Sequence, residues 1–270
     1  MEDVLTTEII DKEICLIKLN RPKALNSLNR NLVETIISSI DECESNNDIR
    51  SIILTGNGRG FCAGADLMDG GWPHEEGWSA GKATANAMDI GFNPLVRKIV
   101  NSKKPIINAV NGVTAGGGVG LALCGDIVIA SKSAIFKLVF GPQLGIIPDV
   151  GASWLVPNLI GRAKANGLAL LGDDLDAKTA FEWGLIWKVV DDDNLINEAT
   201  KIAKKVSDSA ISGLKAVVKA HDHALVSTLD EQLEYERDTQ EVFCNKEEFR
   251  EGVRAFREKR KPNFRDIDAN

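Results

Sequence analysis

Short apolar runs alternate with helical patterns along the first two-thirds of the chain, and this alternation constrains the fold more than any other feature. Five runs have the length and the apolar or β-branched composition of strands: 13–19, 49–56, 105–110, 126–130 and 134–139. Apolar residues recur at helical spacing between them, over 28–43 and 88–101. The run 49–56 is almost continuously apolar, as expected of a strand buried on both faces. The sequence therefore predicts an α/β fold.

Strand-like runs stop at about residue 160, and helical patterns take over from there. These patterns cover 161–171, 176–184, 193–207, 211–225, 228–244 and 247–259. We therefore divide the chain into a core over residues 1–200 and a helical region over residues 201–270. The helical region is expected to serve packing or subunit contacts.

The charge balance argues against a nucleic-acid partner. The 270 residues carry 32 Lys and Arg against 39 Asp and Glu, a net charge of −7, whereas nucleic-acid-binding proteins usually present a basic face. The five cysteines are dispersed without a C-x-x-C pair, which favours reduced core thiols over disulfides or a zinc site. The longest uncharged apolar stretch, 109–125, is shorter than a membrane span, and the N-terminus lacks a secretory signal. We predict a soluble, cytoplasmic protein with no membrane contact.

Two glycine-rich segments follow strand-like runs, at Thr55–Leu67 and Asn111–Leu123. Glycine permits positive φ and lets backbone amides approach a ligand closely. A glycine loop that opens a helix also directs free amides toward one point. Two such loops on neighbouring strands would aim two donors at one oxygen, which is an oxyanion hole. The competing interpretation is a pair of tight turns with close packing.

Other catalytic and binding motifs are absent, incomplete or lack the structural context that they require. The phosphate-binding pattern G-x-x-x-x-G-K-[ST] is absent, and G-x-G-x-x-G beginning at Gly116 fails at Leu121. Residues 77–81 match G-x-S-x-G around Ser79, but no strand precedes this serine, so a nucleophile elbow is disfavoured. His221 and His223 are two positions apart on a helix and point in different directions, which argues against a base or metal ligands there.

The two glycine loops, taken with the segments around them, resemble the enoyl-CoA hydratase/isomerase (crotonase) superfamily. The likeness rests on segments in family order and spacing: LNRPKALNSLN (19–29), IILTGNGRGFCAGADL (52–67), KPIINAVNGVTAGGGVGLALCGDIVIA (104–130), FGPQLGIIPDVGASWLVP (140–157) and 160–190. Within the family, the likeness is strongest to the 1,2-epoxyphenylacetyl-CoA isomerases. The resemblance implies a spiral of ββα units with a C-terminal helical region that forms trimers, often paired into hexamers.

The resemblance also implies an acyl-CoA substrate whose thioester carbonyl lies between two backbone amides. By motif position these amides belong to Ala65 and Gly117, and no metal or cofactor beyond the CoA of the substrate is expected. The residues matched to substrate- or CoA-binding positions are Lys23, Ala24, Ala63, Gly64, Asp66, Leu67, Gly116, Gly118, Lys261 and Phe264. The loop over 69–92, with Trp72, Trp78 and Phe92, is a candidate lining of the acyl pocket; the alternative is a surface loop.

Two departures from the family pattern decide the expected reaction. Hydratases of the family carry glutamates where this chain has Gly120 and Gly141. Hydration needs a base for the water and an acid for the carbon, so their absence disfavours it. Asp149 remains, at the position where the isomerases of the family place a catalytic aspartate, and its apolar neighbours predict a raised pKa. The alternative role for Asp149 is a helix N-cap.

The other carboxylates in or near the matched segments are weaker candidates for catalysis. Asp66 and Asp126 fit hydrogen bonding in turns or loops. Glu75 and Glu76 lie in the variable loop, from which they could reach the site, but they are disfavoured. The sequence therefore predicts an enoyl-CoA isomerase that shifts a double bond or isomerises a ring through a thioester enolate, with Asp149 as the proton shuttle. A 2-enoyl-CoA hydratase and a non-catalytic scaffold of the same fold remain as alternatives.

Overall fold

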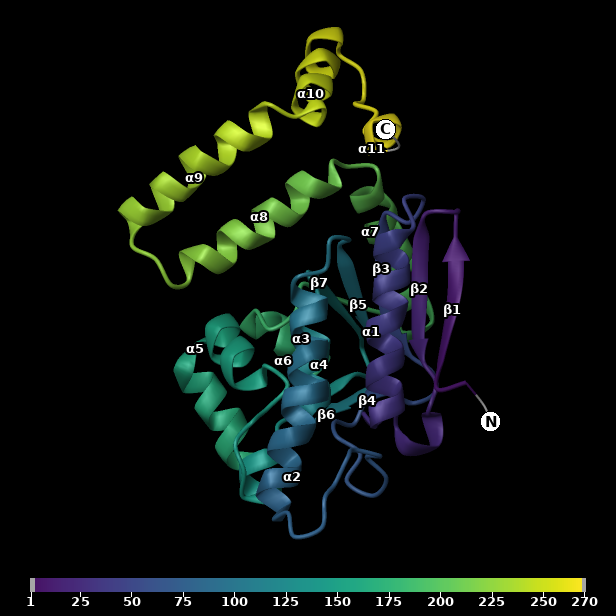
Figure 1. Cartoon of the computed structure of the whole chain (residues 1–270), viewed down its shortest axis with the longest axis vertical. Coiled ribbons are helices and arrows are strands. Elements are labelled where there is room, and N and C mark those ends of the chain that lie inside the picture. Colours follow the sequence, from purple (N-terminus) through teal and green to yellow (C-terminus); the bar gives the residue numbers. More distant parts are fainter. Residues whose placement is uncertain (1–2, 269–270) are drawn as a thin grey trace.

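The computed structural model describes residues 3–268 and shows two sheets wrapped by helices (Figure 1). The larger sheet has the strand order β1-β2-β3-β5-β7-β10, in which β1 is antiparallel to β2 and the other strands run parallel. Its strands are β1 (Leu5–Ile10), β2 (Ile14–Leu19), β3 (Ser51–Gly56), β5 (Ile106–Val110), β7 (Ile127–Ser131) and β10 (Lys188–Val190). The predicted α/β class is confirmed.

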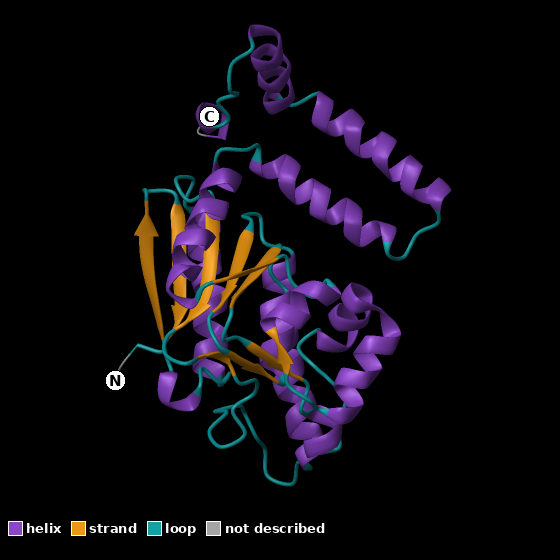
Figure 2. Cartoon of the chain, turned by 180° about the vertical axis from the view of Figure 1, so that it is seen from behind, coloured by secondary structure: helices purple, strands orange, loops and turns teal. Residues whose placement is uncertain are grey.

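The smaller sheet has the order β4-β6-β8-β9, with β9 antiparallel to β8. Its strands are short: β4 (Gly60–Cys62), β6 (Val113–Ala115), β8 (Ile135–Lys137) and β9 (Leu175–Asp176). Three times the chain places one strand in each sheet and then enters a helical segment, which gives the predicted spiral of ββα units. Figure 2 shows the two sheets as separate layers of orange strands.

Helices cover both sheets and form the C-terminal part of the chain. The α-helices are α1 (Arg30–Ser45), α2 (Ala80–Ala87), α3 (Asn93–Val100), α4 (Gly117–Leu123), α5 (Ala152–Leu171), α6 (Ala177–Trp183), α7 (Leu195–Ser207), α8 (Ile211–Ala224), α9 (Leu229–Cys244), α10 (Glu247–Glu258) and α11 (Arg265–Asp268). Four shorter segments are 3-10 or π-helical turns: η1 (Pro22–Ala24), η2 (Met88–Phe92), η3 (Phe140–Leu144) and η4 (Asp192–Asn194).

The inner strands of the larger sheet are buried on both faces, as their apolar runs predict. In β2, Cys15 and Ile17 belong to the main core beneath α1 and α3, whereas Ile14 and Leu16 belong to a second cluster on the other face. Ala199 and Ala203 of α7 close this second cluster, because small side chains let the helix lie close to the sheet. The predicted division at residue 200 therefore falls inside α7, which packs against the core strands.

The helical C-terminal region is confirmed, and it extends away from the sheets. Helices α8 and α9 lie side by side as an antiparallel hairpin, and α10 continues beyond them (Figures 1 and 2). Helix α9 buries none of its residues within the chain, although it carries exposed apolar side chains such as Leu229, Leu233 and Val242. No helix within residues 3–268 is long and apolar enough to cross a bilayer.

Two sequence expectations about the core are wrong. Strands do not stop at residue 160, because β9 and β10 add one strand to each sheet. Cys244 is exposed on α9, so only Cys15, Cys43, Cys62 and Cys124 are core thiols.

Candidate active site

The two glycine loops meet at one edge of the smaller sheet. Strands β4 and β6 are parallel neighbours, with Cys62 paired to Thr114, so the loops that follow them leave the sheet side by side. Gly64 has a φ of +91°, and a Cβ built on it would lie only 2.8 Å from the Gly117 nitrogen. The close approach therefore requires glycine at position 64. The two predicted loops therefore lie in direct contact.

Both predicted amide donors are free of backbone acceptors. Leu28 pairs with the Ala65 loop by donating to the Gly64 carbonyl and accepting from the Asp66 amide, so the Ala65 N–H is left out of this pairing. Gly117 is the first residue of α4, where an amide has no acceptor within the helix. Among residues 3–268, Ala65 donates no backbone hydrogen bond. Two available amides on adjoining loops are the arrangement that an oxyanion hole needs.

These loops form one wall of a cavity of about 650 Å³. Seven of the predicted site residues line it: Ala63, Ala65, Asp66, Leu67, Gly116, Gly117 and Asp149. Three titratable side chains are found in its wall, those of Asp66, His74 and Asp149. Trp72 and Phe92 line it as expected, whereas Trp78 lies outside the wall and contacts His74 and Lys82 instead.

Asp149 lies beside Gly117 with an unsatisfied carboxylate oxygen. Its Oδ1 is buried, has no hydrogen-bond partner among the described residues, and would lie 3.2 Å from a Cβ at Gly117. Burial away from water raises the pKa of Asp149 to about 6, opposed only by a hydrogen bond from its own backbone amide. A carboxylate with this pKa can both take up and release a proton near neutral pH.

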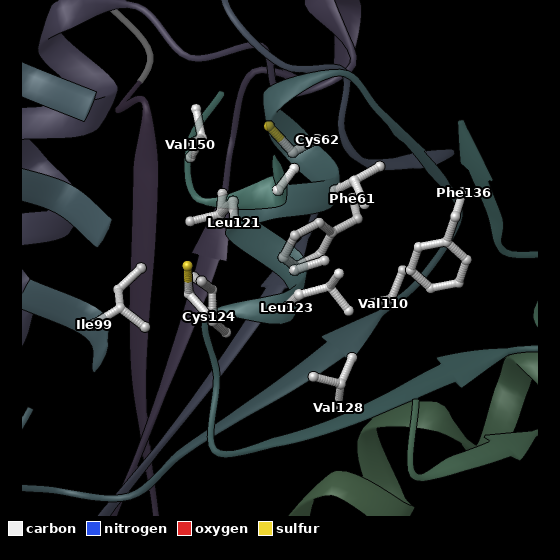
Figure 3. Packing of buried hydrophobic residues seen from close by; sticks show 14 of the residues in the cluster. Phe61, Cys62, Ile99, Val110, Leu121, Leu123, Cys124, Val128, Phe136 and Val150 are labelled. Atoms are coloured by element: carbon white, nitrogen blue, oxygen red, sulfur yellow. The ribbon is translucent and has the colours of Figure 1, made fainter. Parts of the chain in front are cut away.

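The alternative role of Asp149 as a helix cap is wrong. The N-cap of α5 is Gly151, with a φ of +81°, and no side chain caps this helix. Asp149 instead precedes a turn in which Val150 has a φ of +50°, a conformation that a β-branched residue rarely adopts. Val150 is buried next to Cys62 and Leu121 in the packed core (Figure 3), which holds the turn in place.

Gly120, which stands where the family resemblance places the first hydratase glutamate, lies in a tightly packed contact. A Cβ on Gly120 would overlap the Val150 carbonyl oxygen and lie 3.2 Å from the Ala152 nitrogen. Helix α4 and the turn after Asp149 therefore approach each other more closely than any side chain at position 120 allows. Gly141, at the second hydratase position, is exposed and does not line the cavity. Neither position supplies a carboxylate.

Replacing Gly120 with alanine is expected to disturb the turn that carries Asp149. Overpacking at a tight contact costs about 1–3 kcal/mol, so we expect a lower melting temperature and a kcat reduced about tenfold. The matched control is Gly252→Ala in α10, where a Cβ meets nothing within 4 Å. This control should raise stability by about 0.5–1 kcal/mol, because alanine favours helix more than glycine. Equal thermal shifts of the same sign in the two variants would contradict the packing argument.

Asp66 has the structural role that its loop position predicts. Its carboxylate accepts hydrogen bonds from the amides of Met68 and Asp69 and forms an ion pair of 2.8 Å with Arg21. Although partial burial opposes them, the Asp69 amide and Arg21 hold the pKa of Asp66 below its usual range. Asp66 lines the cavity but is committed to these partners, which leaves Asp149 as the unpaired carboxylate of the site.

Asp126 is also structural, because it accepts from the Ile106 amide and pairs with Lys215 at 2.6 Å. Glu75 and Glu76 are exposed and do not line the cavity, and Glu75 accepts from the Trp78 indole. Ser79 is the N-cap of α2 after a loop, so the serine-hydrolase interpretation lacks its required strand.

The predicted CoA-binding residues are not all brought to the cavity within one chain. Lys23 and Ala24 lie in η1 and do not line it, and Lys261 and Phe264 belong to surface depressions beside the C-terminal helices. Gly118 is a packing residue, because a Cβ there would overlap the Cys62 carbonyl.

Sequence reasoning missed His74, which lines the cavity from the loop before α2. Phe140 and Ile146 also line it, from the segment before Asp149. Both lie in the matched segment 140–157, but only the proximity of Ile146 to Asp149 in the sequence was used. His74 belongs to no motif or periodic pattern.

Comparisons with known proteins agree with this geometry. Residues 10–267 match the family described as Enoyl-CoA hydratase/isomerase. The chain is 44% identical over 261 residues to the 1,2-epoxyphenylacetyl-CoA isomerase of Escherichia coli K12, covering 94% of this chain and 96% of that protein. It is 34% identical over 255 residues to a probable enoyl-CoA hydratase of Rhodobacter capsulatus, covering 94% and 95%.

Comparison with solved structures also finds enoyl-CoA hydratases. A crystal structure of an enoyl-CoA hydratase from Bacillus anthracis superposes with a TM-score of 0.87 at 29% identity, covering 96% of this chain and 98% of that chain. The chain belongs to the enoyl-CoA hydratase/isomerase family, the crotonase superfamily, and is an enzyme of that family. The predicted family and fold are thereby confirmed.

Proposed function

We propose that this protein is an acyl-CoA isomerase in which Asp149 is the only proton shuttle. The observation that carries the proposal is the position of the buried, unpartnered Asp149 carboxylate beside Gly117, in a cavity whose other carboxylate, Asp66, is paired with Arg21. The name of the Escherichia coli relative, which is 44% identical, supports an isomerase. The substrate is a CoA thioester with a double bond or strained ring near the carbonyl.

In the proposed reaction, the carboxylate of Asp149 takes a proton from C2 of a 3-enoyl thioester. The electron pair of that C–H bond delocalises to the carbonyl oxygen, and the amides of Ala65 and Gly117 stabilise the enolate charge there. Asp149, now a carboxylic acid, returns the proton to C4, the double bond settles between C2 and C3, and the carboxylate is restored. Preorganised donors at a developing oxyanion contribute several kcal/mol to such a step.

Hydration requires more catalytic groups than this site contains. Adding water requires one group to activate the water and another to protonate carbon, whereas moving a double bond relocates one proton. With glycine at positions 120 and 141, the cavity wall offers no second unpaired carboxylate among the described residues. Conversion of a 3-enoyl-CoA to the conjugated 2-enoyl-CoA, followed by absorbance, tests the proposal. Absence of turnover across an acyl-CoA panel would instead favour a non-catalytic scaffold.

The pH dependence of kcat/KM is expected to report the raised pKa of Asp149. The base must be ionised, so kcat/KM should fall about tenfold for each unit below the Asp149 pKa of about 6 and level off above it. The profile is obtained from initial rates between about pH 4.5 and about 8. Repeating the measurements in a second series of buffers is the control. A profile that stays flat down to about pH 4.5 would contradict the assignment of Asp149 as the base.

We also propose that the chain works in the cytoplasm as a trimer or a pair of trimers, in phenylacetate catabolism. Support for assembly comes from α9, which has no buried residues within the chain yet exposes Leu229, Leu233 and Val242. The proposal also accounts for Lys261 and Phe264, which would reach the CoA of a neighbouring subunit, with Lys23 contacting CoA from its own chain. Light scattering after gel filtration measures the mass, and a monomer would refute this part.

A further inference from the structure

One aromatic side chain in the cavity wall is held unusually tightly. A Cβ on Gly91 would overlap Cη2 and Cζ3 at the benzo end of the Trp72 indole. A Cβ on Gly70 would lie 2.8 Å from Cδ1 and 3.2 Å from Nε1 at the other end. Gly70, from the loop itself, and Gly91, from η2, thus lie close against the two ends of the indole. The position of Trp72 depends on the absence of side chains at both places.

Trp72 and Phe92 form an aromatic part of the cavity wall. Phe92 is buried and meets Trp72 edge to face, with ring centroids 4.9 Å apart and an interplanar angle of 65°. The residues that α2 contributes to the same cavity are Ala83, Thr84 and Ala87, which fill little space. The cavity wall therefore combines two packed aromatic rings with small side chains. This shape favours a planar group over a flexible chain, because ordering a flexible chain costs entropy.

We propose that Trp72 determines the acyl specificity of this enzyme and selects thioesters whose acyl group carries a flat, unsaturated ring. The inference rests on the proposed acyl-CoA function and names the substrate class of the same site. Aromatic rings stack or meet edge to face with a gain beyond that of area burial alone. Because Trp72 is fixed before the ligand arrives, little of that gain is lost to ordering the protein. The expected preference for a ring over a linear acyl chain is about tenfold in Kd.

The test measures binding of two inert thioesters, phenylacetyl-CoA and hexanoyl-CoA, by calorimetry. The wild type should bind phenylacetyl-CoA about tenfold more tightly, and Trp72→Ala should lose this preference while its Kd for hexanoyl-CoA changes little. Gly91→Ala should also reduce the preference, because its methyl displaces the indole. Trp72→Phe combined with Gly91→Ala should restore part of it, because the smaller ring tolerates the methyl.

Trp78→Ala is the matched control, since Trp78 lies in the same loop but outside the cavity wall. It should keep the wild-type preference. Equal Kd values for the two thioesters in the wild type, or an equal loss of both in Trp72→Ala, would overturn the proposal. Neither thioester can be isomerised, and the same measurement on Asp149→Asn should give the same preference, so a failure of the isomerase mechanism leaves this test intact. If neither thioester bound, the acyl-CoA function and this inference would both be refuted.

Discussion

Replacing Asp149 with asparagine is expected to lower kcat for 3-enoyl-CoA isomerisation by about 10²–10⁴-fold. The amide has nearly the same shape but cannot accept the C2 proton, so both halves of the shuttle are lost. Binding should persist, because the cavity wall and the amides of Ala65 and Gly117 are unchanged. We compare kcat and the Kd for an inert acyl-CoA thioester. The control is Asp173→Asn, at an exposed position just after α5.

Asp149→Asn is also expected to change how the melting temperature depends on pH. The folded-state pKa of Asp149 lies above its ordinary value, so the folded protein favours the protonated form. The associated stabilisation is present at low pH and is lost as the pH rises through about 6. Asparagine is neutral throughout, so Asp149→Asn should match the wild type near pH 4 and melt at a higher temperature above about pH 7. A variant that isomerised at the wild-type rate would remove Asp149 from the mechanism.

Replacing Gly64 with alanine is the second large effect, and it tests the main-chain donors that side-chain substitutions leave untouched. The new methyl group would lie 2.8 Å from the Gly117 nitrogen and 2.9 Å from the Ala115 carbonyl oxygen. It would displace the Gly117 amide from its position beside the Ala65 amide. Loss of one oxyanion donor typically lowers kcat by about 10²–10³-fold, and we expect a loss of that size.

Backbone strain alone must be separated from the loss of the donor. Gly77 provides the control, because its φ of +85° is close to the +91° of Gly64 but a Cβ there meets nothing within 4 Å. Gly77→Ala should therefore show the conformational cost in stability without the loss of kcat. If Gly64→Ala kept at least half of the wild-type kcat while folded, the oxyanion hole would not lie between these loops.

The sequence predicts the interior of this fold better than its edges. The buried strands β3, β5 and β7 are continuous apolar runs, because they are covered on both faces. The edge strand β1 was not predicted, since only Leu5 among its residues is buried. Strands β9 and β10 have two and three residues, which is too short for a periodic pattern to register.

In the site, too, features that depend on local sequence were predicted, whereas contacts between residues far apart in the sequence were not. The glycine loops were predicted because glycine after a strand has a local backbone meaning, and Asp149 was singled out by resemblance. The fit between Gly120 and Val150 was not predicted, because residues thirty positions apart meet only through the turn before α5. The contact of Gly91 with Trp72 was missed for the same reason. Lys261 and Phe264 do not line the cavity that holds Asp149.

In the proposed mechanism, one carboxylate moves a proton and no water enters the product. The enzyme can be incubated with a 3-enoyl-CoA and, separately, with crotonyl-CoA in water enriched in heavy oxygen, and the products analysed by mass spectrometry. We expect a 2-enoyl-CoA without heavy oxygen from the first substrate and unchanged crotonyl-CoA from the second. Heavy oxygen in a 3-hydroxyacyl-CoA, formed at a rate comparable to isomerisation, would contradict it.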